Sequence, residues 1–147
     1  MVAPILFSRA VRIYYEHTDA GGVVYHANYL NFMEQIRTEF LREMGVELGR
    51  FEREEGVLFA VRSISIDYRR PARLDDLVEV SLGIAELRPA SITFEQQIDR
   101  GGETLCTATV RVASLSSGQF RPVAVPECLQ VLLERRLRSQ CPEGAKA

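Results

Sequence analysis

The segment HTDAGGVVYHANY, His17 to Tyr29, combines residue types that acid–base or nucleophilic chemistry requires. Its single carboxylate, Asp19, is followed by Gly21 and Gly22, and a helical pattern begins at about Ala27. Position alone favours a structural role for Asp19, in which the side chain bonds the backbone two residues on in an Asx turn. The alternative is a general base or nucleophile held on a rigid corner.

The start of the predicted helix supplies a second element. Backbone N–H groups in a first helical turn have no partner within the helix and carry partial positive charge. They can therefore polarise a carbonyl whose oxygen becomes negative during acyl transfer. We take the backbone N–H of His26 as the candidate donor and expect its imidazole to be a packing residue or a helix-capping residue. Asn28 is the expected helix cap.

Glu34 lies one to two turns into this helix, at the edge of the apolar stripe. A glutamate at such a place is solvated, paired with Arg37 or Arg42, or part of a cleft. The sequence leaves these three alternatives open.

A basic cluster follows in YRRPARLDD, residues 68–76, around Pro71. It is either surface charge in a turn, balanced by the two aspartates Asp75 and Asp76, or a clamp for the phosphates of a nucleotide-bearing substrate. Arg88 and Ser91 are further candidates for such a clamp. The arginines of the cluster are Arg69, Arg70 and Arg73.

Other classes of chemistry find little support. There is no G-x-S-x-G elbow, Cys–His pairing signal or P-loop. The three cysteines, Cys106, Cys128 and Cys141, are odd in number and widely spaced, so neither a disulfide framework nor a metal knuckle is expected.

The net charge of −2 gives no basic field for nucleic acid. Without a membrane-spanning stretch or a signal peptide pattern, we expect a cytoplasmic protein.

One long helix is predicted over residues 27–44, because its apolar residues recur at steps of three and four and Gly45 can end it. An aromatic and β-branched run before it, residues 9–16, predicts a strand. A shorter helical segment covers residues 48–56. The apolar residues of the long helix are Tyr29, Phe32, Met33, Ile36, Phe40, Leu41 and Met44.

The middle of the chain alternates with period two. Strands are expected over residues 59–68, with a bulge near Ser63, and over residues 77–87, 91–99 and 103–115, with a hairpin turn at Arg100–Gly102. Pro126 opens a short amphipathic helix to about residue 139, and residues 140–147 form a tail.

We therefore predict a single domain over residues 1–147 with its core at about 8–125. It is a two-layer α+β domain in which one sheet covers one helix, and its exposed sheet edges favour an oligomer.

The run VRIYYEHTDAGGVVYHANYLNFMEQIRTEFLREMG closely resembles the signature of the hotdog-fold acyl-CoA thioesterases. It is most similar to the YbgC subgroup, the Tol–Pal-associated thioesterases, which are akin to 4-hydroxybenzoyl-CoA thioesterase. The resemblance continues through FAVRSISIDYRRPARLDDLVEV and the two later strands, and it covers roughly residues 10–125.

This resemblance implies a long central helix wrapped by a curved antiparallel sheet, homodimers that join two such sheets, tetramers of these dimers, and active sites at the dimer interface. It makes Asp19 the catalytic carboxylate and the His26 backbone N–H the group that polarises the thioester carbonyl. The implied substrate is an acyl-CoA or acyl carrier protein thioester, with no metal or redox cofactor. Many members have aspartate where this chain has His17. The expected substrate-binding residues are Gly22, Tyr25, Glu34, Phe59, Arg70, Arg73, Arg88 and Ser91.

Two other functions stay open at this point. A hotdog dehydratase or hydratase acts on similar thioesters but needs a histidine–carboxylate pair to move protons at carbon. A binding module holds acyl-CoA or acyl carrier protein without turnover. Release of free thiol distinguishes a hydrolase from both.

Overall fold

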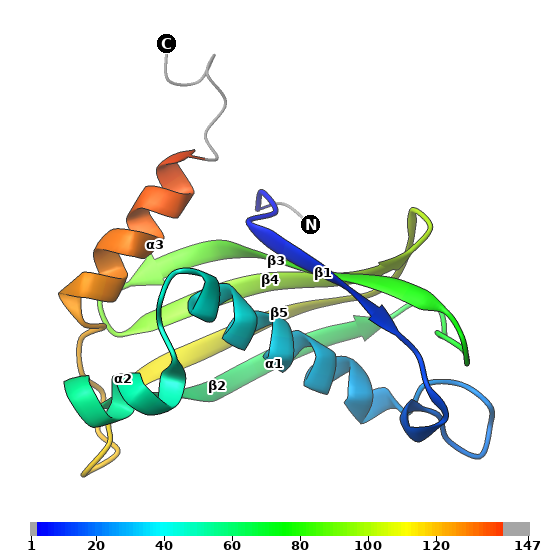
Figure 1. Cartoon of the computed structure of the whole chain (residues 1–147), viewed down its shortest axis with the longest axis horizontal. Helices are drawn as coiled ribbons and strands as arrows, with labels where there is room; N and C mark the ends of the chain where they lie inside the picture. Colours follow the sequence, from blue (N-terminus) through cyan, green and yellow to red (C-terminus); the bar gives the residue numbers. More distant parts are fainter. Residues whose placement is uncertain (1–2, 140–147) are drawn as a thin grey trace.

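A five-stranded antiparallel sheet curves around one long helix (Figure 1). This computed structural model describes residues 3–139. The strands lie in the order β1-β3-β4-β5-β2, so β1 and β2 form the two edges. This arrangement confirms the predicted α+β hotdog class. The strands are β1 (Phe7–Arg12), β2 (Val57–Tyr68), β3 (Leu77–Arg88), β4 (Ser91–Arg100) and β5 (Glu103–Ser116), and the helices are α1 (His26–Glu43), α2 (Leu48–Glu55) and α3 (Glu127–Ser139).

The helix α1 lies against the concave face of the sheet, as the spacing of its apolar residues predicts (Figure 1). It buries one stripe and exposes the opposite side, which is the pattern of a helix that covers a core. Gly45 follows its end with φ of 88°, a left-handed conformation that favours glycine. The buried residues of the stripe are Tyr29, Phe32, Met33, Ile36, Phe40 and Leu41.

The period-two strands form as predicted. The pairing of β2 with β5 shifts register between Val61 and Ser63, which confirms the bulge. The β4–β5 hairpin turns through Gly101 and Gly102, both with positive φ. Burial alternates along β4 and most of β5, whereas β3 is buried continuously from Val80 to Ile84, and the apolar side chains of these strands form the core with α1.

The predicted strand over residues 9–16 is wrong at both ends. The strand β1 pairs with β3 only from Phe7 to Arg12, and a 3₁₀ turn, Tyr15–His17, follows it. Local hydrogen bonds stabilise that turn, because the Tyr14 N–H donates to His17 Nδ1 at 2.9 Å and the Thr18 hydroxyl donates to the Tyr15 carbonyl at 2.8 Å. Side-chain bonds of this kind compete with the sheet ladder and here override the β propensity of the tyrosines.

The predicted C-terminal helix is present as α3, directly after Pro126, with Leu129 and Leu133 buried against the rest of the core. The predicted tail, residues 140–147, lies outside the described residues. Within residues 3–139, none of the helices is long and apolar enough to span a bilayer.

Candidate active site

Asp19 lies in a tight hairpin formed by residues 18–24. Thr18 and Val24 pair across it, and the Asp19 N–H donates to the Val23 carbonyl at 2.9 Å. The carboxylate Oδ1 accepts the Gly21 N–H at 2.8 Å, so the side chain does form the Asx turn. Its Oδ2 has no hydrogen-bond partner among the described residues, and the residue is exposed. One oxygen thus fixes the orientation of the carboxylate, while the other is available for chemistry.

The first turn of α1 has no side-chain cap. Tyr25 is the N-cap residue, and no side chain bonds the free N–H groups. Asn28 is not the cap that we predicted, because its amide instead donates to the His17 carbonyl at 2.8 Å. Within the described chain, neither the His26 N–H nor the Ala27 N–H has an acceptor. The predicted donor is therefore unpartnered, and a second free donor lies beside it.

Two segments distant in sequence meet at this helix start. Val23 pairs with Arg73, and the Val24 N–H donates to the Ala72 carbonyl at 2.9 Å. The Asp19 hairpin therefore adjoins the segment that joins β2 to β3. An open hollow at this junction is lined by Val24, His26, Tyr29, Tyr68, Arg69, Arg70 and Pro71.

Two tyrosines form hydrogen bonds across this junction, and neither bond was predicted from the sequence. The Ala72 N–H donates to the Tyr29 hydroxyl at 2.9 Å, and the Tyr68 hydroxyl donates to the His26 carbonyl at 2.9 Å. The sequence shows Tyr29 only as part of the apolar stripe and Tyr68 only as the end of a strand. Their partners lie about 40 residues away along the chain, so no local pattern could identify the bonds.

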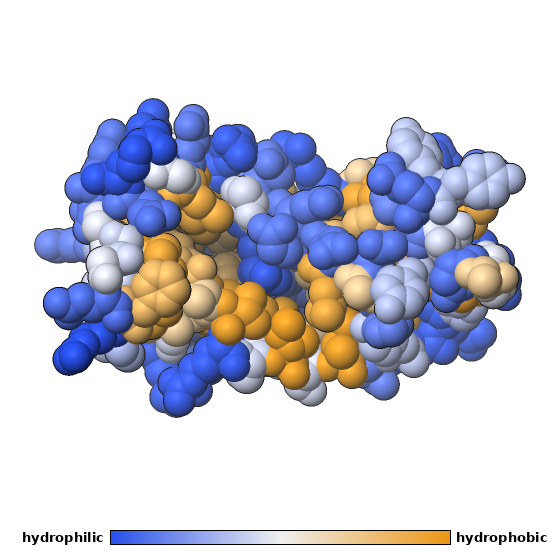
Figure 2. Space-filling view, turned by 90° about the horizontal axis from the view of Figure 1, so that it is seen from below, coloured by the Kyte–Doolittle hydropathy of each residue, from blue (hydrophilic) through white to orange (hydrophobic). Residues whose placement is uncertain are grey.

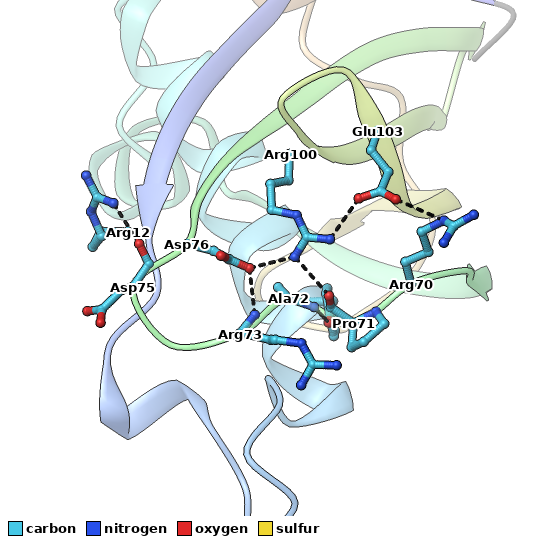
Figure 3. Close-up of polar contacts among 10 residues, drawn as sticks. Arg12, Arg70, Pro71, Ala72, Arg73, Asp75, Asp76, Arg100 and Glu103 are labelled. Carbon is cyan, nitrogen blue, oxygen red and sulfur yellow. Dashed lines mark hydrogen bonds and ion pairs between the residues drawn. The ribbon is translucent and has the colours of Figure 1, made fainter.

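The basic segment is organised by an arginine that the sequence analysis did not single out (Figure 3). Arg100 donates to Asp76 Oδ2 and to Glu103 Oε1, each at 2.7 Å, and to the Pro71 carbonyl at 3.1 Å. Asp76 Oδ2 also accepts the Arg73 N–H at 2.8 Å. These bonds join the start of β3 and the β4–β5 hairpin to the segment between β2 and β3.

The arginines of the predicted clamp differ in what they contact. Arg70 pairs with Glu103 at 3.0 Å, and Arg69 pairs with Asp67 at 3.1 Å. No described carboxylate lies within ion-pair distance of the Arg73 guanidinium. Of the two aspartates that could balance the cluster, only Asp76 contacts it, because the Asp75 carboxylate points away (Figure 3). Arg73 is thus the best placed of the three to receive an anionic group.

Arg88 and Ser91 do not join this cluster within one chain. The strand β3 begins just after Arg73 and ends at Arg88, so its length, on the order of 35 Å, separates them. Arg88 pairs with Glu86 at 3.0 Å, and Ser91 is buried at the start of β4. Their predicted role in substrate binding stays a prediction that requires a second chain.

Glu34 and Phe59 line one cavity between α1, α2 and the sheet, with a volume of about 120 Å³. Glu34 accepts a hydrogen bond from the Thr38 hydroxyl at 3.0 Å, and it pairs with neither Arg37 nor Arg42. Figure 2 shows a hollow on this side of the molecule with apolar side chains around it. The cavity is mainly apolar, and its remaining lining residues are Arg37, Thr38, Leu41, Leu48, Val61, Ile92, Phe94 and Val112.

A buried glutamine bonds a half-buried arginine beside this cavity. Gln96, fully buried on β4, donates to the Met33 carbonyl at 3.0 Å and accepts from Arg37 at 2.8 Å. Burial lowers the pKa of Arg37, and the nearby Glu34 carboxylate partly opposes this effect. Gln96 shares the inner face of β4 with Ile92, Phe94 and Ile98, and the packing of α1 on that face supplies its hydrogen-bond partners.

Cys106 lies on the inner face of β5 opposite Tyr68, close to the helix start. Burial, with a contribution from the Asp67 charge, raises the pKa of the Cys106 thiol to about 12. A nucleophilic cysteine requires a thiolate at neutral pH. Cys106 is therefore a packing residue, and Asp19 remains the candidate catalytic side chain.

The Arg100 network predicts a pH-dependent contribution to stability. Partial burial by itself raises the pKa of Asp76, but the hydrogen bonds from the Arg73 N–H and from Arg100 outweigh it and leave that pKa below its ordinary value. The stabilisation is therefore complete above the pKa of the unfolded state and is lost as pH falls through the lower folded pKa. We expect Asp76→Asn to reduce the free energy of unfolding by about 1–3 kcal/mol at pH 7.

Urea unfolding from pH 7 down to pH 3 tests this. The difference between wild type and Asp76→Asn should shrink below about pH 4, where an ordinary carboxylate becomes protonated. The matched control is Asp75→Asn, which removes the same charge at the neighbouring residue. The Asp75 carboxylate has no described partner, and only its backbone carbonyl accepts a hydrogen bond, from Arg12. Equal effects of the two substitutions at pH 7 would contradict the assignment.

Comparison with known proteins identifies similar chains. The sequence profile of the thioesterase superfamily matches residues 21–107. The acyl-CoA thioesterase YbgC of Haemophilus influenzae is 46% identical over 121 residues, which cover 82% of this chain and 89% of that protein. The acyl-CoA thioester hydrolase YbgC of Escherichia coli O6:H1 is 42% identical over 84% of this chain and 92% of that protein. A crystal structure of a "probable thioesterase" from Bartonella henselae has a TM-score of 0.79 at 36% identity and covers 84% of this chain and 100% of that one.

Proposed function

The chain belongs to the thioesterase superfamily, and on that basis we propose that it hydrolyses acyl-CoA thioesters to a free acid and CoA. The names of its relatives support this reaction, and the resemblance seen in the sequence agrees with them. The observation that carries the proposal is the uncapped start of α1, whose two free N–H groups directly follow the hairpin that orients the Asp19 carboxylate. Acyl carrier protein thioesters are a second proposed substrate.

In the proposed mechanism the thioester carbonyl lies against the first turn of α1. The His26 N–H then stabilises the negative charge that develops on the carbonyl oxygen. Asp19 either removes a proton from the attacking water or attacks the carbonyl carbon itself, which gives a mixed anhydride that water hydrolyses. In both routes the C–S bond breaks and CoA leaves as a thiolate. The reaction calls for no metal or redox cofactor.

We further propose that the active enzyme is a homodimer joined through β2, and that two dimers form a tetramer. The strand β2 is an edge of the sheet and pairs only with β5 in the described chain. Apolar side chains on it are solvent-exposed in one chain, including Val61 (47%), Ile64 (41%) and Tyr68 (43%). A long apolar edge strand without a partner favours pairing with another strand. Figure 2 shows the apolar surface on this side of the molecule.

Antiparallel pairing of β2 with its copy gives a reason for the positions of Arg88 and Ser91. Pairing about the middle of β2 would bring the Tyr68 end of one strand beside the Val57 end of the other. Ser91 pairs with Ala113 of β5, and Val57 pairs with Ser116 of the same strand, so both lie at that end of the sheet. The substrate site at one helix start would then include Arg88, Ser91 and Phe59 of the second copy.

Charge in the middle of this edge should separate the dimer. We expect Ile64→Lys to be monomeric by size-exclusion chromatography with light scattering and to release thiol from acyl-CoA at least about tenfold more slowly than wild type. The assay uses acetyl-, butyryl-, benzoyl- and palmitoyl-CoA and one acyl carrier protein thioester.

The matched control is Ile5→Lys, which makes the same change at another exposed isoleucine, 52% exposed and before β1. It should keep the oligomeric state and the activity. An Ile64→Lys variant that stays dimeric with full activity would refute the β2 interface. A wild type that binds acyl-CoA but releases no thiol from any substrate would show a binding module instead of a hydrolase.

The described residues favour a hydrolase over a dehydratase. A dehydratase would use a hydrogen bond between a histidine and a carboxylate, and no such bond is present at the described site. The His26 ring instead packs against Tyr25, with 4.6 Å between ring centroids.

We also propose a cytoplasmic location, which is supported by the free thiols of both described cysteines, Cys106 and Cys128.

A further inference from the structure

The peptide group between His26 and Ala27 has an unusual set of contacts. Its N–H, on Ala27, is one of the two free donors at the start of α1. Its carbonyl, on His26, accepts a hydrogen bond from the Tyr68 hydroxyl at 2.9 Å. A side chain from the end of the edge strand β2 therefore bonds the opposite end of a peptide unit whose N–H points out of the helix.

The preceding peptide group has the same pattern. Its N–H is the His26 donor, and its carbonyl, on Tyr25, accepts the Asn28 N–H at 2.8 Å. A hydrogen bond to a peptide carbonyl polarises the group and strengthens its N–H as a donor. Both free donors thus belong to peptide groups whose carbonyls are already engaged. Of these two bonds, only the one from Tyr68 to the His26 carbonyl comes from a side chain.

The Tyr68 ring is well placed to hold its hydroxyl in one position. It contacts the Tyr29 ring edge to face, with 5.4 Å between centroids, and it lies 6.4 Å from the His26 ring at 87°. Tyr29 is itself buried and fixed by the Ala72 N–H. Burial raises the pKa of Tyr68, with smaller contributions from Cys106 and Tyr29, so the hydroxyl remains a donor at neutral pH.

We propose that Tyr68 is a positioning residue that orients and polarises the His26–Ala27 peptide, so that the Ala27 N–H acts with the His26 N–H as a second donor to the thioester oxygen. This inference rests on the proposed hydrolase function and extends it to a two-donor site. It also links the site to the proposed interface, because Tyr68 ends the strand through which the dimer forms.

Tyr68→Phe tests the inference, because it removes one oxygen atom and keeps the ring contacts. In the full chain, we expect kcat for butyryl-CoA and benzoyl-CoA to fall about five- to tenfold, as for the loss of one neutral hydrogen bond. KM and the affinity for free CoA, measured by calorimetry, should change less than about twofold, since the bond acts when charge develops in the transition state. The control is Tyr15→Phe, whose ring is 80% exposed and which should keep wild-type kinetics.

Two outcomes would overturn the proposal. An unchanged kcat in Tyr68→Phe would show that the bond has no effect on the reaction. A fall in kcat would show a general structural role if the affinity for CoA fell by the same factor, or if the melting temperature or the dimer fraction also fell. A wild type that hydrolyses no thioester refutes the proposed function, whereas an active wild type with an equally active Tyr68→Phe refutes only this inference.

Discussion

Asp19→Asn should reduce the turnover of acyl-CoA by at least about 100-fold, the range expected when a general base or nucleophile is lost. The substitution leaves the fold in place, because asparagine also forms Asx turns and can accept the Gly21 N–H with its own Oδ1. It changes the free Oδ2 into an amide nitrogen, which can neither remove a proton from water nor attack a carbonyl. The measurement is thiol release under saturating substrate, together with the melting temperature.

The control for this experiment is Glu16→Gln. Glu16 is an exposed carboxylate three residues earlier, in the 3₁₀ turn, and its replacement makes the same chemical change. It should retain nearly full activity. Wild-type turnover in purified Asp19→Asn would exclude Asp19 as the catalytic carboxylate, and equal losses in both variants would indicate a field effect of the local negative charge.

The second large effect is expected at His26, where a backbone atom is tested by mutation. Proline at this position lacks the N–H, so His26→Pro should lower kcat by about 100-fold, as for other removed oxyanion donors. The helix should tolerate it, because His26 is the first residue of α1 and proline is favoured there. Tyr25 has φ of −62° and ψ of 134°, which is the extended conformation required before proline.

His26→Ala separates the backbone from the imidazole. It keeps the N–H and removes the ring that packs against Tyr25 and Tyr68. We expect it to retain far more activity than His26→Pro, within about tenfold of wild type. Circular dichroism of both variants checks that α1 is intact. Equal losses in the two, or a larger loss in His26→Ala, would assign the role to the imidazole. Wild-type activity in His26→Pro would refute the backbone donor.

The parts of the fold that could be predicted from the sequence are those that local periodicity and turn chemistry set. The three- and four-residue spacing from Tyr29 to Leu41 defined α1, because a helix brings those positions onto one face. The alternation along β3 to β5 and the two glycines of the hairpin defined most of the sheet. The Asx turn of Asp19 could also be predicted, since a carboxylate before a glycine corner is visible in the sequence. The His26 N–H could be named as a donor from the predicted helix start, but the absence of a side-chain cap there could not, because Asn28 was expected to supply one.

Tertiary structure alone decided how those parts are joined. The Tyr68–His26 bond and the Arg100–Asp76 bond connect residues 42 and 24 positions apart, and a local pattern carries no information about such partners. The misjudged first strand has a local cause, because the His17 side chain accepts the Tyr14 N–H three residues before it and competes with the sheet. The expected Asn28 cap is absent because its amide donates to the His17 carbonyl instead. Arg70 and Arg88 were expected at one substrate site, but they lie at opposite ends of the sheet within one chain, where Arg70 pairs with Glu103 and Arg88 pairs with Glu86. Hydrogen bonds and ion pairs form wherever the packing of α1 on the sheet leaves suitable groups close together, and that packing is a property of the whole folded chain.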